Sequence, residues 1–275
     1  MTEYLDANGV RFAYLAEGSG PLVVLIHGFP DTARTWDAVR PELARAGFRA
    51  FSPYTRGYFP TPVPADGRYD VETLGRDVIA WIDALGERQA IVVGHDWGAT
   101  AAYAAATLAP ERVRYLVTVA IPHPASLRPT PRIVWGARHM ILFQRKNAEA
   151  QVRANDFAHI DELVRRWSPA WSVPADETRP VKEAFRHPES LTAALGYYRA
   201  IQLRPPRSLR KRISVPSAVF SGADDGILRL EDYESARRFY AASHEIVHMP
   251  GGHFLHREHP GRFTDELLRL VRGAS

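Results

Sequence analysis

The sequence predicts an α/β protein in which a mostly parallel sheet, flanked by helices, is interrupted by a helical insertion. Two continuous apolar runs, at residues 21–29 (PLVVLIHGF) and 89–94 (QAIVVG), are typical of strands buried on both faces. Helical stretches alternate with strands, which indicates a parallel sheet with helices on both sides. Core strands then stop from 122 to 212, a gap too long for a loop in a compact domain.

The elements before the insertion can be predicted one by one. Asn8-Gly9 marks the turn of an N-terminal hairpin between two alternating segments. Asp70 is placed to cap a helix that ends before Gly86. After the first buried run we expect a helix over 36–46, a strand at 48–53, the capped helix over 70–85, the strand at 89–94, an alanine-rich helix over 98–109 and a strand at 113–120.

The insertion is rich in Arg, Trp and Pro, and helical stretches are expected near 133–146, 148–167 and 188–201. The sheet resumes afterwards with apolar runs at 215–222 and 244–250, and a last helix covers 260–271. We therefore expect a core domain of residues 1–121 and 213–275, into which a helical cap domain of residues 122–212 is inserted.

Composition excludes several classes of function. The 275 residues contain no cysteine, which rules out disulfides, thiolate metal sites and cysteine nucleophiles. The formal charge of +4 is spread over scattered arginines, so no nucleic-acid partner is expected. We see no signal peptide and no run long enough to span a bilayer, and we expect a cytoplasmic protein without a membrane partner. No two of the eleven histidines show convincing metal-ligand spacing with a third ligand, and we expect neither metal nor cofactor.

The stretch GHDWG, residues 94–98, follows a predicted buried strand and precedes a predicted helix. It fits the pattern Gly-x-nucleophile-x-Gly, in which a sharp strand-to-helix turn needs small residues two positions before and after the central one. The central residue is Asp96, where many hydrolases have serine. On its own, the pentapeptide is equally compatible with a strand end at Gly94 and a helix N-cap at Asp96.

Three further motifs follow other predicted strands: HGFP (27–30), SGADDG (221–226) and GGHF (251–254). The last two of these motifs supply, in chain order after the nucleophile, an acid and then a histidine. Together with GHDWG they resemble the epoxide hydrolase and dehalogenase branch of the α/β-hydrolase fold, and the insertion lies where that family carries its cap. The resemblance spans both halves of the core, and the four motifs are specific only as a set.

This resemblance implies a role for each motif. Asp96 becomes the nucleophile, His253 the base that activates water, and Asp225 the acid that orients the histidine, with the adjacent Asp224 as the second choice. The backbone N–H groups of Phe29 and Trp97 become the oxyanion hole. An aspartate is already ionised at pH 7 and needs no base to attack an sp³ carbon, so the histidine is needed only to hydrolyse the resulting ester.

Two cap segments resemble those that supply proton donors to an epoxide oxygen. ALGYYRA (194–200) places Tyr198 before arginine, and RHMILFQ (138–144) places His139 where many epoxide hydrolases have tyrosine. We expect Tyr198 and His139 to act as a pair, through a phenol or a protonated imidazole. A non-catalytic role remains open for each residue: Tyr198 as a core tyrosine under the cap, and His139 as a solvated helix histidine.

The preferred prediction is therefore an epoxide hydrolase, with a small epoxide as substrate and water as co-substrate. A haloalkane or haloacetate dehalogenase is the first alternative. It is disfavoured because fluoroacetate dehalogenases carry arginines where this chain has Trp97 and Thr100, and haloalkane dehalogenases favour Asn where it has Phe29. A hydrolase-fold protein that binds a small molecule without turnover is the second. A homodimer is left open.

The remaining motif histidines are expected to be structural. His27 and His95 flank motif glycines and are predicted to be buried and hydrogen-bonded. His256 and His259 follow closely after His253 and are predicted to lie at the surface.

Overall fold

The computed structural model describes residues 1–202 and 206–273, and it contains a sheet of eight strands with the order β1-β2-β4-β3-β5-β6-β7-β8. Strand β2 pairs antiparallel with both β1 and β4, and every other pairing is parallel. The strands are β1 (Glu3–Ala7), β2 (Val10–Glu17), β3 (Leu22–Ile26), β4 (Arg49–Pro53), β5 (Ala90–His95), β6 (Val113–Val119), β7 (Ser217–Gly222) and β8 (His244–Met249).

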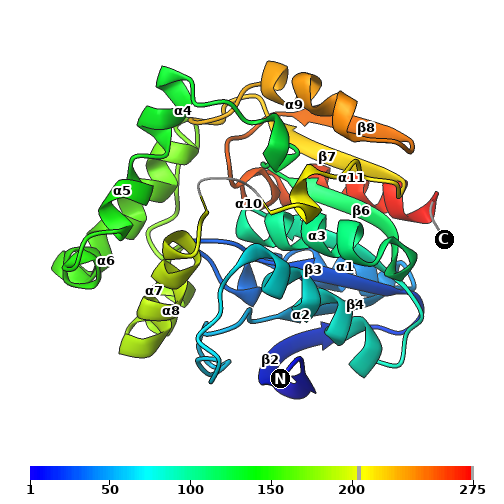
Figure 1. Ribbon diagram of the computed structural model, residues 1–275, viewed down its shortest axis with the longest axis horizontal. Coiled ribbons are helices and arrows are strands. Elements are labelled where there is room, and N and C mark those ends of the chain that lie inside the picture. Colours follow the sequence, from blue (N-terminus) through cyan, green and yellow to red (C-terminus); the bar gives the residue numbers. More distant parts are fainter. Residues whose placement is uncertain (203–205, 274–275) are drawn as a thin grey trace.

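Helices cover both faces of this sheet (Figure 1). Alternate residues of β3 explain the two layers, because Val24 and Ile26 pack with α2 and α3, whereas Val23 and Leu25 pack with α1 and α11. The core helices are α1 (Arg40–Arg45), α2 (Val71–Ala84), α3 (Trp97–Leu108), α9 (Leu230–Ala236), α10 (Leu255–Glu258) and α11 (Pro260–Arg272). The predicted α/β class with a mostly parallel sheet is confirmed.

The chain between β6 and β7 forms the predicted helical insertion, which stands at one end of the sheet in Figure 1. Its helices are α4 (Pro131–Gly136), α5 (His139–Phe143), α6 (Ala148–Trp167), α7 (Arg179–Phe185) and α8 (Pro188–Arg199). We call this region the cap. Its division from the core at 121/122 and 212/213 stays a prediction.

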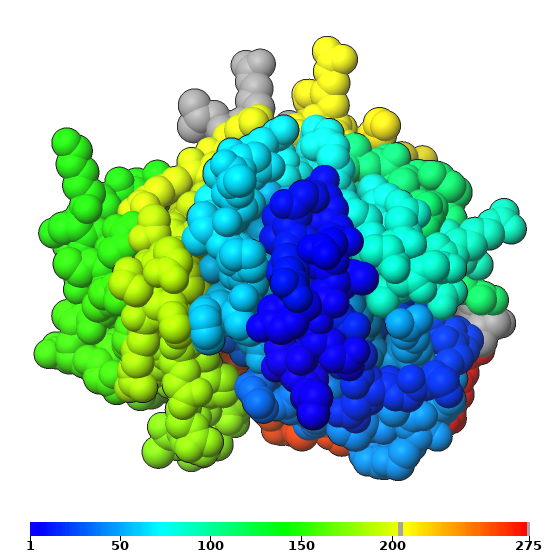
Figure 2. Space-filling view, turned by 90° about the horizontal axis from the view of Figure 1, so that it is seen from below, coloured from blue at the N-terminus to red at the C-terminus, as the bar shows by residue number. Residues whose placement is uncertain are grey.

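The cap packs closely on the loop that follows β4. Tyr197 of α8 donates a hydrogen bond from its hydroxyl to the carbonyl of Arg56, at 2.9 Å. The backbone N–H of Phe59 donates to the hydroxyl of Ser190, also on α8, at 3.0 Å. In Figure 2 the yellow-green atoms of this helix lie directly against the light blue atoms of the loop. The loop itself is held by a buried ion pair, in which Arg56 Nε lies 2.6 Å from Asp77 Oδ2.

Most predicted elements are confirmed, with four differences. The stretch 133–146 is two short helices, α4 and α5, and the helix expected over 36–46 begins only at Arg40. Helices α7, α9 and α10 were not predicted. Within α6 the backbone of residues 154–157 is not helical, so this helix is kinked. Over the described residues, no helix combines the length and hydropathy needed to cross a membrane.

Candidate active site

Asp96 stands on a sharp turn between β5 and α3, with φ +51° and ψ −116°. This backbone conformation is strained for a residue with a side chain. The turn is possible because its two glycines allow backbone contact that a side chain would block. A Cβ on Gly94 would lie 2.2 Å from the Gly98 carbonyl oxygen, and a Cβ on Gly98 would lie 2.2 Å from that of Ile26. Asp96 therefore has the geometry of a nucleophile elbow.

One oxygen of the Asp96 carboxylate is already held by a backbone donor. The N–H of Phe29, in the loop after β3, donates to Asp96 Oδ1 at 2.8 Å. Gly28 permits this approach, because a Cβ there would lie 2.4 Å from Asp96 Cβ. Trp97 is the first residue of α3, where a backbone N–H has no partner within the helix. The two predicted oxyanion donors therefore lie in the loop after β3, where the Phe29 N–H contacts Asp96, and at the first residue of α3, next to Asp96 in the chain.

His253 and Asp225 lie behind the second oxygen of Asp96. His253 Nε2 is 3.5 Å from Asp96 Oδ2, and His253 Nδ1 is 3.3 Å from Asp225 Oδ2. Asp225 Oδ1 accepts from the backbone N–H groups of Ile227 and Leu228, at 2.6 and 2.9 Å. Asp224 is exposed and accepts from the N–H of Gly251. The acid that faces the histidine is therefore Asp225.

The surroundings of His253 favour its charged form. Burial acts to lower the pKa of this imidazole, but hydrogen bonds and charges from Asp225 and Asp96 outweigh burial and raise the pKa to about 9. His95 packs against it with ring centroids 5.0 Å apart, and burial keeps the pKa of His95 well below its usual range. At neutral pH the unreacted site thus holds an imidazolium between two carboxylates.

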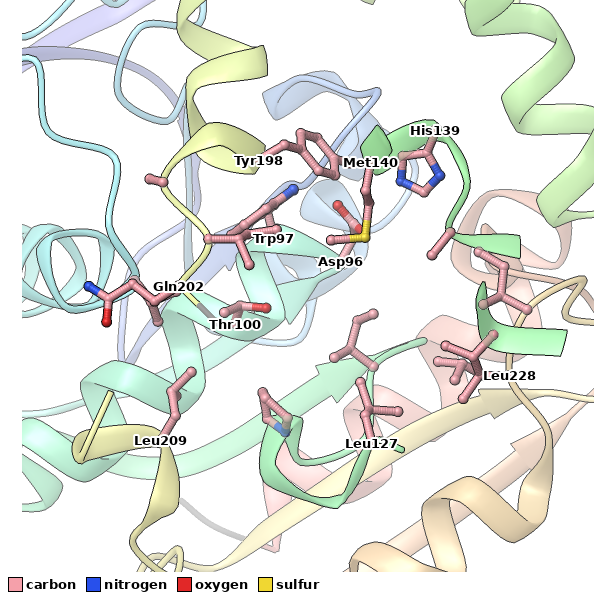
Figure 3. A pocket seen from close by; sticks show the side chains of 18 of the residues that line it. Asp96, Trp97, Thr100, Leu127, His139, Met140, Tyr198, Gln202, Leu209 and Leu228 are labelled. Carbon is pink, nitrogen blue, oxygen red and sulfur yellow. The ribbon is translucent and has the colours of Figure 1, made fainter. Parts of the chain in front are cut away.

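Tyr198 and His139 form the opposite wall of the site and come from the cap helices α8 and α5 (Figure 3). Both side chains are buried, and their ring centroids are 5.4 Å apart. The Tyr198 ring also contacts Phe29, Trp97 and Phe143, with centroids 5.3, 5.2 and 4.9 Å away. Neither residue is a solvated surface group.

Burial also decides the protonation of this pair. It raises the pKa of the Tyr198 phenol well above its usual range, and the charge of Asp96 adds to the effect. It lowers the pKa of His139 to about 3, although Asp96 opposes this shift. Both groups are therefore neutral at pH 7. His139 Nδ1 lies 3.4 Å from the Gly136 carbonyl, which can only accept, so a neutral ring that makes this contact carries its proton on Nδ1. The ring can donate to another acceptor only in the Nε2–H tautomer, without this contact.

Asp96, His253, Tyr198 and His139 all line one cavity of about 380 Å³. The other side chains that line this cavity are mainly apolar, and Figure 3 shows several of these side chains around Asp96. Of the described residues, no lysine or arginine lines it. The apolar lining includes Trp97, Ile121, Leu127, Ile133, Met140, Trp167, Ile201, Leu209, Ile227 and Leu228.

Sequence reasoning missed the part played by Trp167. This buried ring lies between the two histidines of the site, with centroids 4.8 Å from His139 and 5.2 Å from His253. The sequence contained one signal, a tryptophan at the end of a predicted cap helix. Nothing in its spacing indicated that the chain would turn there towards His253.

Of the other motif histidines, His27 and His95 are buried and hydrogen-bonded as predicted. His259 is exposed as predicted, but His256 is completely buried, so its predicted surface position was wrong. His256 lies on the inner side of α10, where its Nε2 is 2.7 Å from the Thr35 hydroxyl. A four-residue helix turned this side chain inwards.

The buried groups of Asp31, His95 and His256 lie within 4.8 Å of one another and could in principle hold a metal ion. The positive charges around these three groups disfavour a bound metal ion. Arg257 Nη1 already pairs with Asp31 Oδ2 at 2.8 Å, and the other Asp31 oxygen accepts from the N–H of Thr32. A divalent cation here would stand beside this guanidinium and close to the imidazolium of His253. We therefore assign no metal to the cluster.

The chain is similar to known proteins over nearly its whole length. It is 28% identical to the AB hydrolase superfamily protein YfhM of Bacillus subtilis, covering 98% of this chain and 97% of that protein. It is 27% identical to epoxide hydrolase A of Mycobacterium tuberculosis, covering 98% and 96%. The fold matches epoxide hydrolase VrEH1 from Vigna radiata with a TM-score of 0.86, at 24% identity over 99% and 98% of the two chains.

A family model described as the alpha/beta hydrolase fold matches residues 21–260. The matched range includes the elbow at Asp96, the acid loop at Asp225 and the histidine loop at His253. On this match, together with the sheet order and the elbow geometry, the chain belongs to the α/β-hydrolase fold family.

Proposed function

We propose that this protein is an epoxide hydrolase, which opens a small epoxide to a vicinal diol through an ester on Asp96. One observation carries the proposal. An ionised carboxylate on the elbow faces a buried tyrosine of the cap across a mainly apolar cavity. The similarity to epoxide hydrolase A of M. tuberculosis supports it.

In the first half-reaction, Asp96 Oδ2 attacks one carbon of the epoxide ring. The carbon–oxygen bond to the leaving oxygen breaks, and that oxygen takes a proton from the Tyr198 phenol, leaving a phenolate and a hydroxyalkyl ester. The raised pKa of Tyr198 keeps this proton in place until an alkoxide, which is a stronger base, develops. His139 donates a hydrogen bond to the same oxygen in its neutral Nε2–H tautomer, which gives up the long contact with the Gly136 carbonyl, because burial disfavours the protonated form.

In the second half-reaction, His253 takes a proton from water, and the hydroxide adds to the ester carbon of Asp96. Charge develops on Oδ1, which the N–H of Phe29 already contacts, with the N–H of Trp97 as the second donor. The tetrahedral intermediate then collapses to the Asp96 carboxylic acid, which releases its proton to solvent and restores the carboxylate. The diol oxygen leaves with the proton from His253, and the Tyr198 phenolate regains its proton from solvent.

Formation of the ester on Asp96 also lowers the pKa of the base that later hydrolyses it. The charge of Asp96 is one of the two that raise the pKa of His253 to about 9, at which the imidazole cannot act as a base at neutral pH. Esterification removes that charge, so the pKa of His253 falls, the imidazolium releases its proton to solvent, and the neutral ring can then accept a proton from water. The base is thus released only after the nucleophile has reacted.

The two alternatives are less well supported. A haloacetate carries a carboxylate, but no arginine or lysine among the described residues lines the cavity to bind it. A protein that only binds a ligand would not need the nucleophile, base and acid together at 3.3–3.5 Å.

A substrate panel tests the proposal. Aryl and aliphatic epoxides are compared with fluoroacetate and haloalkanes, and the release of diol and of halide is measured. Diol from at least one epoxide, with no halide release, is the expected result. Halide release without diol supports the dehalogenase, and no turnover of any compound supports the binding protein.

A further inference from the structure

The end of α6 contacts both loops that carry the hydrolytic pair. The carbonyl oxygen of Trp167 accepts two backbone hydrogen bonds, each of 3.1 Å. One comes from the N–H of His253 itself, and the other from the N–H of Gly226, the residue after Asp225. The carbonyl of one cap residue, Trp167, thus holds the backbone of both His253 and Gly226, the residue next to Asp225.

The next residue, Ser168, adds a second connection to the histidine loop. Its hydroxyl donates to Glu258 Oε1 at 2.6 Å and accepts from the backbone N–H of Phe254 at 3.1 Å. The same Glu258 oxygen accepts from the N–H of Gly252 at 2.8 Å. The N–H groups of residues 252, 253 and 254 are therefore all tied, directly or through Glu258, to Trp167 and Ser168.

Two glycines make room for this contact from two different loops. A Cβ on Gly226 would lie 2.2 Å from the carbonyl oxygen of Arg166, and a Cβ on Gly252 would lie 2.5 Å from the Cα of Ser168. Side chains at these positions would push the cap chain away from both loops. The glycines beside Asp225 and His253 are thus an independent sign that this close approach is part of the site.

We propose that Trp167 and Ser168 form a positioning bracket, through which the cap holds His253 against Asp225 for the hydrolysis of the ester. The inference rests on the proposed function. It assigns Ser168 and Glu258 as positioning residues, which touch neither substrate nor reacting atoms. The cap would then serve both half-reactions, with Tyr198 in the first and the bracket in the second.

The geometry shows why ester hydrolysis, rather than ring opening, should be sensitive to a displacement of the loops that carry His253 and Asp225. The contact of His253 Nδ1 with Asp225 Oδ2 is already 3.3 Å long, so a small displacement of either loop would break it. The groups that face His253 are Asp225, Asp96 and the neutral His95. Once Asp96 is esterified, Asp225 alone supports the charge that the imidazole acquires when it takes a proton. Ring opening uses Asp96 and the cap donors and does not need this contact.

Ser168→Ala is the main test, and Ser190→Ala is its matched control. Ser190 is also a buried cap serine whose hydroxyl accepts a backbone N–H of the core, from Phe59, but it lies away from His253. Formation and hydrolysis of the ester are measured separately by rapid quench and intact-protein mass. In Ser168→Ala we expect unchanged ester formation and hydrolysis slowed about tenfold, the loss typical of a buried hydrogen bond to a charged group. Ser190→Ala should change neither step.

A purely structural role of Ser168 would leave the pKa of His253 unchanged, whereas loss of the bracket in Ser168→Ala should lower it. With Asp225 less firmly held, the acid limb of the hydrolysis rate shifts to lower pH in Ser168→Ala, as does the imidazole titration followed by NMR in the unreacted protein. Parental hydrolysis with an unshifted pH profile overturns the inference. So does an equal slowing of both half-reactions.

Two further measurements keep the test decisive. If Ser168→Ala does not fold, Glu258→Gln, which keeps the shape and an acceptor for Gly252, should slow hydrolysis by less than Glu258→Ala does. Equal rates in these two variants contradict the bracket. If no epoxide esterifies the parent protein, the proposed function fails, while the NMR titration of Ser168→Ala still supports or overturns the positioning role.

Discussion

The two walls of the active-site cavity hold their functional groups by different means. On the core wall, Asp96, His253 and Asp225 are ionised, and backbone N–H groups or ion pairs fix each of them. On the cap wall, Tyr198 and His139 are neutral and are held mainly by contacts between rings. Under the proposed function, this difference divides the chemistry between the two walls. The core supplies the charged groups, and the cap supplies uncharged donors in an apolar layer.

This division predicts a gradient of effects. A change on the core wall removes a charge that nothing else replaces, whereas a change on the cap wall leaves the second donor in place. Effects on the chemical steps should therefore decrease from Asp96 to the cap pair.

The largest effect is expected for Asp96→Asn, because an amide cannot attack the epoxide carbon. Alkylation should fall by more than about 10⁴-fold, the scale on which loss of a nucleophile acts. In the parent, single turnover in ¹⁸O-water should give a first diol whose new oxygen comes from Asp96. Solvent label in that first product would show that water attacks directly and that the core wall does not supply the nucleophile.

The next effect is expected for His253→Gln, which separates the two half-reactions on the core wall. The ester should still form but hydrolyse about 10²- to 10⁴-fold more slowly, so added mass accumulates on the intact protein. Asp225→Asn should slow the same step, and the exposed Asp224→Asn serves as the control. If Asp224→Asn is the more damaging change, the acid has been assigned to the wrong residue.

Tyr198→Phe tests the cap wall, because it removes the proton but keeps the ring and its contacts. We expect alkylation to slow by about 10²-fold, with ester hydrolysis unaffected. His139→Phe should have a smaller effect, since Tyr198 still donates, and the double variant should nearly abolish ring opening. Pre-steady-state alkylation and a thermal melt measure these outcomes. Parental rates in both single variants would mean that the pair only packs.

The last prediction concerns stability. The folded-state pKa of His253 is about 9, above the usual 6.5, so its charged contacts stabilise the fold fully below about pH 6.5 and are lost as pH rises through 9. The parent should therefore lose up to about 3 kcal/mol more than His253→Gln between pH 6 and 10. Melting curves across this range measure the difference. Parallel curves would show that the core wall does not hold an imidazolium.

The core wall was largely predictable from sequence, because each of its groups belongs to a short motif at the end of a strand. Asp96, Phe29 and His253 come together since parallel strands end at one edge of the sheet. The choice of Asp225 over Asp224 came from the family resemblance, and Asp225 lies against the histidine in the structure.

The cap wall was predictable only through resemblance. The spacing of α8 could not distinguish a donor from a packing tyrosine at Tyr198, because both require a buried face. The split between α4 and α5, the kink in α6 and the turn at Trp167 depend on tertiary contacts that no local pattern shows. The surface position predicted for His256 failed for the same reason, since a short helix packed it inwards.

The insertion of the cap between β6 and β7 has a consequence for protein engineering. These strands are parallel neighbours in the sheet, so the chain leaves the carboxyl edge of the sheet after β6 and re-enters at the opposite edge to begin β7. A cap from another protein can be grafted between these strands without rethreading the sheet, provided that it keeps the return segment that leads to the start of β7. Such a chimera would gain a new substrate range only if its graft also presented a carbonyl to residues 226 and 253, as Trp167 does here.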